Sequence, residues 1–195
     1  MRLVFAVRLF VAVNLPAEMR QAAYSAAAPL REGNLPIRWV ASDALHITLK
    51  FLGDVEEERA RAIGPALGTA VAAAKPFEVT LGGFGAFPDE ERPRVVWIGV
   101  ERHPALELLA NDVERALAPL GFDAELRPFQ PHLTLGRSRG DARPAALRGL
   151  PALAQRAEYD GVLRVESVDL MESRLGPAGA TYHVVHRAPL GRGGA

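Results

Sequence analysis

The stretch Leu45-His46-Ile47-Thr48-Leu49 recurs 86 positions later as Pro131-His132-Leu133-Thr134-Leu135. Both copies share the order His, aliphatic residue, Thr, Leu, and aliphatic and Thr residues are typical of strands. Side chains alternate across a strand, so His and Thr project from one face while the aliphatic residues enter the core. Each copy therefore predicts a strand that presents an imidazole beside a hydroxyl. If the two strands occupy matching places in two halves of a pseudo-symmetric fold, both pairs face one cleft.

The segments around these two stretches alternate between strand and helix patterns. We expect strands over residues 8–15, 39–41, 46–52, 77–87, 95–100, 132–136, 162–172 and 182–188. We expect helices over residues 17–30, 55–74 and 104–120, the last with apolar residues at three- and four-residue spacing. Strands meet strands by short turns on both sides of each helix. This order favours the α+β class with antiparallel sheets over a doubly wound parallel sheet.

Composition narrows the class of protein further. A chain of 195 residues with 49% hydrophobic and 24% charged residues can bury a full core as one domain or two packed lobes. The formal net charge is zero, so no global field draws the chain onto duplex DNA or an anionic membrane. Of the 23 basic residues 21 are arginines, whose planar fork suits phosphate, although GC-biased coding gives the same bias. With no cysteine, a disulfide framework, a thiolate nucleophile and a Cys-ligated metal are excluded.

The apolar segments of the sequence indicate the cellular location that we expect for the protein. The apolar run over residues 1–13 contains two arginines and leads into Asn14-Leu15-Pro16, a poor cleavage site, so it predicts a strand and not a signal peptide. No apolar run reaches the roughly 18 residues that a membrane-spanning helix needs. We therefore expect a cytoplasmic protein with no membrane contact. Because the composition indicates no large exposed apolar patch, we expect a monomer without an obligate protein partner.

Two histidines around one phosphorus atom suit an in-line displacement. One neutral imidazole takes a proton from water while the other, protonated, gives a proton to the leaving oxygen. This chemistry requires no metal and no other cofactor. Thr48, Thr134 and a nearby arginine would hold the non-bridging phosphate oxygens and stabilise their charge. A lone His-x-Thr on a strand is usually a structural pair, but two copies with identical polar positions are hard to obtain from strand propensity alone.

Two further residues are candidates for substrate binding. Arg137 lies three residues beyond Thr134, outside the regular alternation of that strand, where it would reach a phosphate or stack on a base. Phe10, in the first strand, has two interpretations: its ring stacks on a terminal base, or it packs into the core beside its aliphatic neighbours.

Taken together, these motifs resemble the two-histidine phosphoesterases, in particular the RNA 2′,3′-cyclic phosphodiesterases that are also called 2′-5′ RNA ligases. The resemblance covers residues 8–188 and combines the two His-x-Thr-Leu motifs with further landmarks along the chain. These landmarks are Arg8 to Ala12 leading to Leu15-Pro16, Trp39, Lys50-Phe51-Leu52-Gly53, Phe87-Pro88, Pro93 to Trp97, Phe129-Gln130-Pro131, Gly136-Arg137, Leu170 to Leu175, Gly179 and Tyr182.

The resemblance implies a two-lobed, pseudo-symmetric α+β fold. Each lobe is then an antiparallel sheet with outer helices, and a central active-site groove carries both motifs. Residues 1–195 would form a single domain, with residues 1–7 as an N-terminal extension and residues 189–195 as a flexible tail.

The reaction that the resemblance implies belongs to RNA processing. It is metal-independent hydrolysis of a terminal 2′,3′-cyclic phosphate of RNA to a 2′-phosphomonoester. Reversible 2′-5′ ligation is the same chemistry with a 5′-hydroxyl in place of water. Carried over by motif position, His46 is the proton donor, His132 is the proton acceptor, and Thr48 and Thr134 hold the phosphate. The expected partners are RNA 3′ ends or nucleotides with a cyclic phosphate.

Other functions compete with this one. A non-catalytic module would use the same groove to bind nucleotides or RNA, but binding alone needs neither a proton donor nor an acceptor. A phosphodiesterase acting on a small cyclic nucleotide would keep the chemistry and change the substrate. A metal-dependent hydrolase fits poorly, because the sequence has no H-x-x-E-H or H-E-x-x-H cluster and no cysteine.

Overall fold

The computed structural model describes residues 6–176 and 179–191 of the chain. The strands in this part are β1 Ala6–Asn14, β2 Ile37–Trp39, β3 His46–Glu56, β4 Phe77–Phe87, β5 Val95–Val100, β6 His132–Ser138, β7 Asp160–Val165, β8 Ser167–Gly176 and β9 Gly179–Pro189. The helices are α1 Ala17–Ala26, α2 Ala28–Glu32, α3 Glu57–Val71, α4 Pro104–Leu117 and α5 Leu150–Ala154, with short 3-10 turns at Ser42–Ala44, Ala118–Leu120 and Pro144–Leu147.

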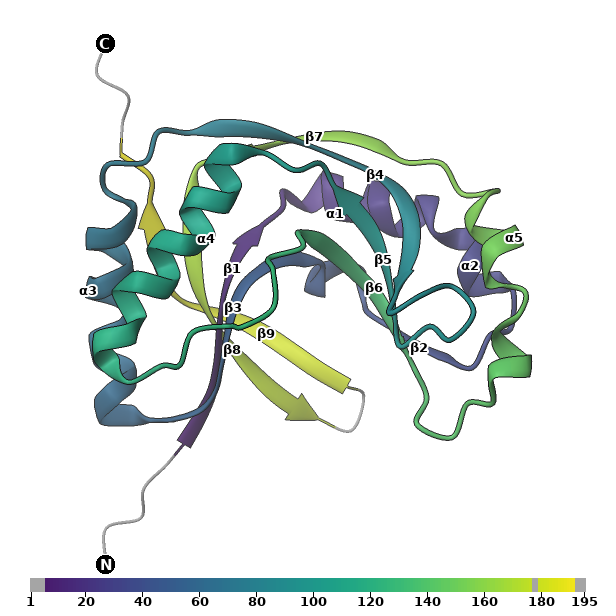
Figure 1. The fold of residues 1–195 in the computed structure, drawn as a ribbon, viewed down its shortest axis with the longest axis horizontal. Coiled ribbons are helices and arrows are strands. Elements are labelled where there is room, and N and C mark those ends of the chain that lie inside the picture. Colours follow the sequence, from purple (N-terminus) through teal and green to yellow (C-terminus); the bar gives the residue numbers. More distant parts are fainter. Residues whose placement is uncertain (1–5, 177–178, 192–195) are drawn as a thin grey trace, which may run out of the picture.

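Within the described residues, all nine strands join one antiparallel sheet. Its order is β7-β4-β5-β6-β3-β1-β8-β9, with β2 added to β6. Read outward from the centre, β3-β1-β8-β9 forms one half and β6-β5-β4-β7 the other. The two halves meet where Ile47 of β3 pairs with Leu133 of β6. The predicted α+β class and pseudo-symmetric lobes are confirmed, and the lobes are halves of one curled sheet (Figure 1).

Two of the helices pack on the half of the sheet opposite to the strand that precedes them. Helix α4 connects β5 to β6, yet it packs against α3 and β3 of the other half. Helix α2 follows β1 but contacts α5, which packs on β4. The apolar stripe of α4 is buried because it faces this shared core, which also takes in Ile47 and Leu133. The helices therefore cover one face of the sheet, and the opposite face, which carries His46, Thr48, His132 and Thr134, is called the open face below.

Two elements are divided differently from the sequence-based expectation, and the strand expected over residues 39–41 lies instead at Ile37–Trp39. The strand expected over residues 162–172 is two strands, because Val165 pairs with Phe77 of β4 whereas Ser167 pairs with Pro189 of β9. Only Glu166 separates them, so the chain crosses directly from one half of the sheet to the other (Figure 1). No Gly or Pro lies at this crossing, so the strand pattern of the sequence continues from β7 into β8 without a break. The helix expected over residues 17–30 is split at Ala27, and proline near the start of α2 is compatible with a new helix there.

The predicted single domain over residues 1–195 stays a prediction. Residues 1–5 of the expected extension and residues 192–195 of the expected tail lie outside the described part of the chain. Ala6 and Val7 already belong to β1, and Leu190 is buried and donates its amide to the carbonyl of Glu166. None of the helices in the described residues is long and apolar enough to cross a membrane.

Candidate active site

The open face holds both imidazole–hydroxyl pairs at the centre of the sheet. Ile47 and Leu133 are paired across β3 and β6 and are fully buried under the helices. By alternation, the residues on either side of each of them project from the other face, where all four are half-buried. The structure therefore brings together His46 and Thr48 from one half of the sheet and His132 and Thr134 from the other.

The same backbone contact orients each imidazole. Nδ1 of His46 lies 2.8 Å from the carbonyl oxygen of Ala44, and Nδ1 of His132 lies 2.8 Å from that of Gln130. A carbonyl oxygen only accepts hydrogen bonds, so Nδ1 is the protonated nitrogen in both rings. This leaves Nε2 of each ring for proton transfer. Nε2 of His46 lies 3.1 Å from the Thr48 hydroxyl, which donates to it while the ring is neutral.

Aromatic rings hold both imidazoles from the side. Phe10 lies against His46 with 4.8 Å between ring centroids, and Tyr182 meets the same imidazole edge-on at 5.1 Å. Phe87 meets His132 edge-on at 5.0 Å. Phe10 is only 3% exposed, so of its two sequence interpretations the structure shows packing, here against the His46 ring and not in the main core. A ring so covered has no free face for a base.

Burial and nearby positive charge keep the two imidazoles neutral in the free protein. Burial is the main cause that lowers the pKa of His46 to about 4, opposed by the Ala44 carbonyl and reinforced by positive charge on His132 and Arg137. Burial also lowers the pKa of His132, again with a contribution from Arg137. At neutral pH both Nε2 atoms therefore carry a lone pair in the free protein.

A β-bulge brings Arg137 to the same face as the histidines. Val96 of β5 pairs with Gly136 and Trp97 pairs with Thr134, so Leu135 is an extra residue in β6. Leu135 and Gly136 are both buried, and alternation resumes with Arg137 exposed on the open face. The sequence placed Arg137 outside the regular alternation of this strand, and the bulge is the reason. No carboxylate in the described part of the chain forms an ion pair with it.

Phe51 is a site residue to which sequence reasoning gave no role. Ala12 of β1 pairs with Thr48 and Val11 pairs with Lys50, so Leu49 forms a bulge in β3 that matches the one in β6. Phe51 emerges on the open face next to Phe10, with 67% of the residue exposed. The available signal was its position, five residues past His46, since Arg137 lies five past His132.

Two imidazole–hydroxyl pairs beside one arginine with no ion-pair partner are chemically suited to acid–base reactions of phosphate esters. Within the described residues, no cluster of three or more His, Cys, Asp or Glu side chains that could hold a metal ion is present. The family model described as the 2′-5′ RNA ligase superfamily matches residues 17–177. The chain belongs to this superfamily, which confirms the resemblance read from the motifs.

Individual relatives agree with this assignment. A protein of Methanothermobacter thermautotrophicus named RNA 2′,3′-cyclic phosphodiesterase is 35% identical over 176 residues, which cover 90% of this chain and 95% of the relative. A protein of Aeropyrum pernix with the same name is 38% identical over 167 residues, covering 81% and 90%.

Solved structures show the same fold. TT0787 of Thermus thermophilus superposes with a TM-score of 0.77 and 30% identity, covering 94% of this chain and 97% of that protein. Escherichia coli LigT, crystallised with 3′-AMP, superposes with a TM-score of 0.74 and 30% identity, covering 95% and 98%.

Proposed function

We propose that this protein is an RNA 2′,3′-cyclic phosphodiesterase that opens a terminal cyclic phosphate to a 2′-phosphomonoester without a metal ion. The relatives named for this activity support the reaction, as does membership of the superfamily. The observation that carries the proposal is the placement of two imidazoles with identical Nδ1 contacts on one face. Such a pair supplies both proton transfers that the hydrolysis needs.

The water molecule is the nucleophile. Its oxygen attacks phosphorus while Nε2 of His132 accepts one of its protons. The bond between phosphorus and O3′ breaks, and the protonated Nε2 of His46 gives its proton to O3′. The products are a 2′-phosphate and a free 3′-hydroxyl, so one water is consumed and the protonated site returns after one proton passes between the rings and solvent.

Binding of the substrate provides the proton that His46 needs. In the free protein burial holds the pKa of His46 at about 4, so the ring is neutral at pH 7. A cyclic phosphate carries one negative charge, and an opposite charge next to an imidazole favours its charged form. The substrate therefore raises the pKa of His46 as it binds, while water attacks from the side of the neutral His132.

The remaining open-face residues bind the substrate. The hydroxyls of Thr48 and Thr134 donate to the non-bridging oxygens, and the guanidinium of Arg137 stabilises the charge that builds up on them. The exposed ring of Phe51 stacks on the terminal base. A 5′-hydroxyl in the place of water attacks phosphorus and displaces O3′ by the same steps to give a 2′-5′ linkage, and attack of the 3′-hydroxyl on that linkage reverses the ligation.

A single assay tests this function. Purified protein is incubated in excess chelator with a short RNA that ends in a 2′,3′-cyclic phosphate, and the product is compared with 2′- and 3′-phosphate standards. We expect a 2′-phosphate from the wild type and a loss of about 10²- to 10⁴-fold in His46→Ala and in His132→Ala. His103→Asn is the matched control, because it removes an imidazole at the N-cap of α4 and keeps a capping acceptor.

Two other results of this assay would contradict the proposed function or its mechanism. Activity that disappears with chelator and returns with a divalent metal contradicts the metal-free mechanism. Tight binding of the RNA without turnover favours a binding module. The monomeric state and the cytoplasmic location belong to the same proposal, and sedimentation of the purified protein and cell fractionation test them.

A further inference from the structure

A pocket of about 230 Å³ lies next to His46 on the open face. It lies between the end of β1 and the hairpin of β8 and β9. Its lining includes Asn14, Arg20, His46, Tyr182, Val184 and Arg187. The reaction proposed above uses only His46 of this set, so the two arginines have no role in it.

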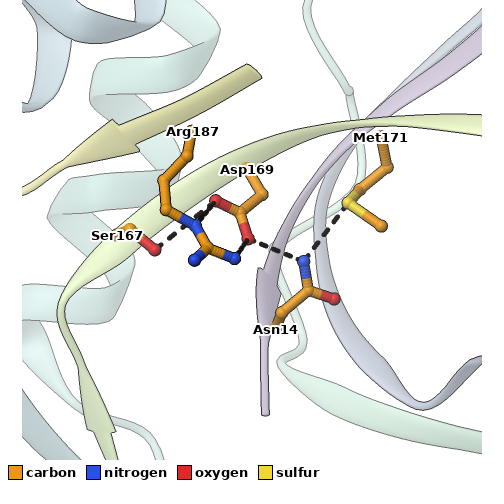
Figure 2. A network of polar contacts seen from close by, with 5 residues as sticks. All are labelled: Asn14, Ser167, Asp169, Met171 and Arg187. Atoms are coloured by element: carbon orange, nitrogen blue, oxygen red, sulfur yellow. Dashed lines mark hydrogen bonds and ion pairs between the residues drawn. The ribbon is translucent and has the colours of Figure 1, made fainter. Parts of the chain in front are cut away.

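The first arginine, Arg187, is held in a fixed orientation. The fully buried carboxylate of Asp169 accepts from its Nε at 2.9 Å and from its Nη2 at 3.0 Å (Figure 2). Asn14 donates to the same carboxylate at 2.7 Å, and Ser167 lies at 3.4 Å. Arg187 pairs directly with Asp169 across β9 and β8, and cross-strand partners share a face, so both side chains lie on the open face. Its side chain stays 62% exposed, and Nη1 has no hydrogen-bond acceptor among the described residues.

The second arginine, Arg20, enters the pocket from α1. Its Nη1 donates to the carbonyl oxygen of Asp43 at 2.9 Å, whereas its Nε is buried and has no hydrogen-bond partner in the described part of the chain. A buried donor without a partner is costly, so an anion that accepts from it would stabilise this arrangement. The carboxylate of Asp43 also borders the pocket and opposes an anion there. Against this one carboxylate, the guanidinium groups of Arg20 and Arg187 line the same pocket from α1 and β9.

The position of the pocket relative to the reacting atoms indicates which anion it takes. O3′ leaves at Nε2 of His46, so the ribose of the terminal nucleotide lies on the His46 side of the site. The RNA chain continues from the 5′ oxygen of that ribose, and the next charge along it is a phosphodiester. The pocket borders His46 and offers unpaired donors from two arginines.

We propose that Arg20 and Arg187 form an upstream subsite for the phosphodiester that links the terminal nucleotide to the one before it. This inference rests on the proposed function, because it takes its direction from O3′ leaving at His46. The subsite makes the protein prefer RNA ends over a nucleoside 2′,3′-cyclic phosphate, which lacks a 5′-phosphate.

The test compares three substrates: adenosine 2′,3′-cyclic phosphate, its 5′-phosphorylated form, and the ApA dinucleotide ending in the cyclic phosphate. We expect kcat/KM to rise about tenfold with either 5′ addition in the wild type, mainly through KM. In Arg20→Gln the ratio of kcat/KM with a 5′ addition to kcat/KM without it should fall toward one. The double variant Asp169→Asn/Arg187→Gln removes the second guanidinium without leaving a buried carboxylate unpaired, and we expect the same fall.

Arg164→Gln is the matched control, because Arg164 of β7 is a similarly exposed strand arginine with a carboxylate partner two residues away. It should keep the wild-type ratio. A wild-type ratio of one, or a ratio that both subsite variants retain, overturns the upstream subsite. A gain with ApA but not with the 5′-phosphate alone also overturns it. Failure of the proposed function is distinct, since then none of the three substrates is hydrolysed.

Discussion

Phe51 and Arg137 occupy equivalent positions on the two central strands of the sheet. Each lies five residues past a motif histidine, and each reaches the open face through a bulge, at Leu49 in β3 and at Leu135 in β6. One half of the pseudo-symmetric scaffold thus presents an aromatic ring at this position, and the other presents a cation. In the function proposed above, the two halves supply the same acid–base residues, while Phe51 takes the base on one side and Arg137 takes the phosphate on the other.

Replacing Phe51 with alanine should weaken binding of the terminal nucleotide. Stacking of a base on an aromatic side chain contributes about 1–3 kcal/mol, so we expect kcat/KM on an RNA cyclic phosphate to fall about tenfold in Phe51→Ala. Phe51→Trp should retain activity, since it keeps an aromatic face. The thermal unfolding midpoint should stay close to that of the wild type because the residue is 67% exposed. Leu126→Ala, at a loop residue 95% exposed, is the control, and equal activity in Phe51→Ala and this control would refute the stacking role.

Arg137→Gln should lower kcat and raise the pKa of both His46 and His132. Removing one donor that stabilises developing charge typically costs 10²- to 10³-fold in kcat, and we expect a loss of about that size. The positive charge of Arg137 also lowers the pKa of His46 and that of His132, so both pKa values should rise in the variant. A pH titration of the two rings by NMR measures this directly. Arg139→Gln is the control for a nearby exposed arginine, and pKa values that do not move in Arg137→Gln contradict the placement of its guanidinium beside both rings.

The two motif strands were readable from sequence because strand alternation is a local property. His46 and Thr48 must share a face, and so must His132 and Thr134, whatever the strands pair with. The face reached by Phe51 was not readable in this way. A bulge arises from the register between two strands, and the sequence of one strand does not encode that register.

The packing partner of Phe10 and the crossing at Glu166 were also beyond prediction from local sequence. The aliphatic neighbours of Phe10 predict a buried ring, but only the tertiary pairing of β1 with β3 places that ring against His46. The crossing at Glu166 escaped prediction because the residues on both sides have strand propensity. The network of Asn14, Asp169 and Arg187 joins residues more than 150 positions apart, so no local pattern indicates it.

The buried imidazole of His46 should make folding stability depend on pH. Its pKa is about 4 in the folded protein, against 6.5 for an unperturbed histidine, so between these values the unfolded chain binds more protons. Stability conferred by the neutral ring is therefore full above pH 6.5 and falls as the pH drops toward 4. At about 1.4 kcal/mol per pKa unit, the wild type should lose about 3 kcal/mol more than His46→Gln between pH 7 and pH 4. Urea unfolding at several pH values measures the difference, and parallel curves for the two proteins would exclude it.

Lys50 should make a strong stabilising contact between β3 and the segment formed by α4 and the loop that follows it. It is the residue between the β3 bulge and Phe51, its side chain is 4% exposed, and its Nζ donates to Glu114 of α4 at 2.5 Å and to the carbonyl oxygen of Asp123 at 2.7 Å. Lys50→Met leaves Glu114 without its cation in a largely buried place, so we expect a loss of about 2–3 kcal/mol in the free energy of unfolding. The double variant Lys50→Met/Glu114→Gln should recover part of that loss because the orphaned charge is gone.

The exposed ion pair between Arg61 and Glu57 of α3 provides the comparison for Lys50. Its atoms are 3.9 Å apart and both side chains are well exposed, so Arg61→Met should cost less than about 0.5 kcal/mol. Chemical denaturation of the variants at one ionic strength measures all of these values. Asp123 begins the segment that leads to His132, so we expect Lys50→Met also to lower kcat. This loss of kcat should persist in Lys50→Met/Glu114→Gln, because that double variant restores the charge balance but not the hydrogen bond to the Asp123 carbonyl oxygen. Equal unfolding free energies for Lys50→Met and Arg61→Met would show that the buried contact does not stabilise the fold.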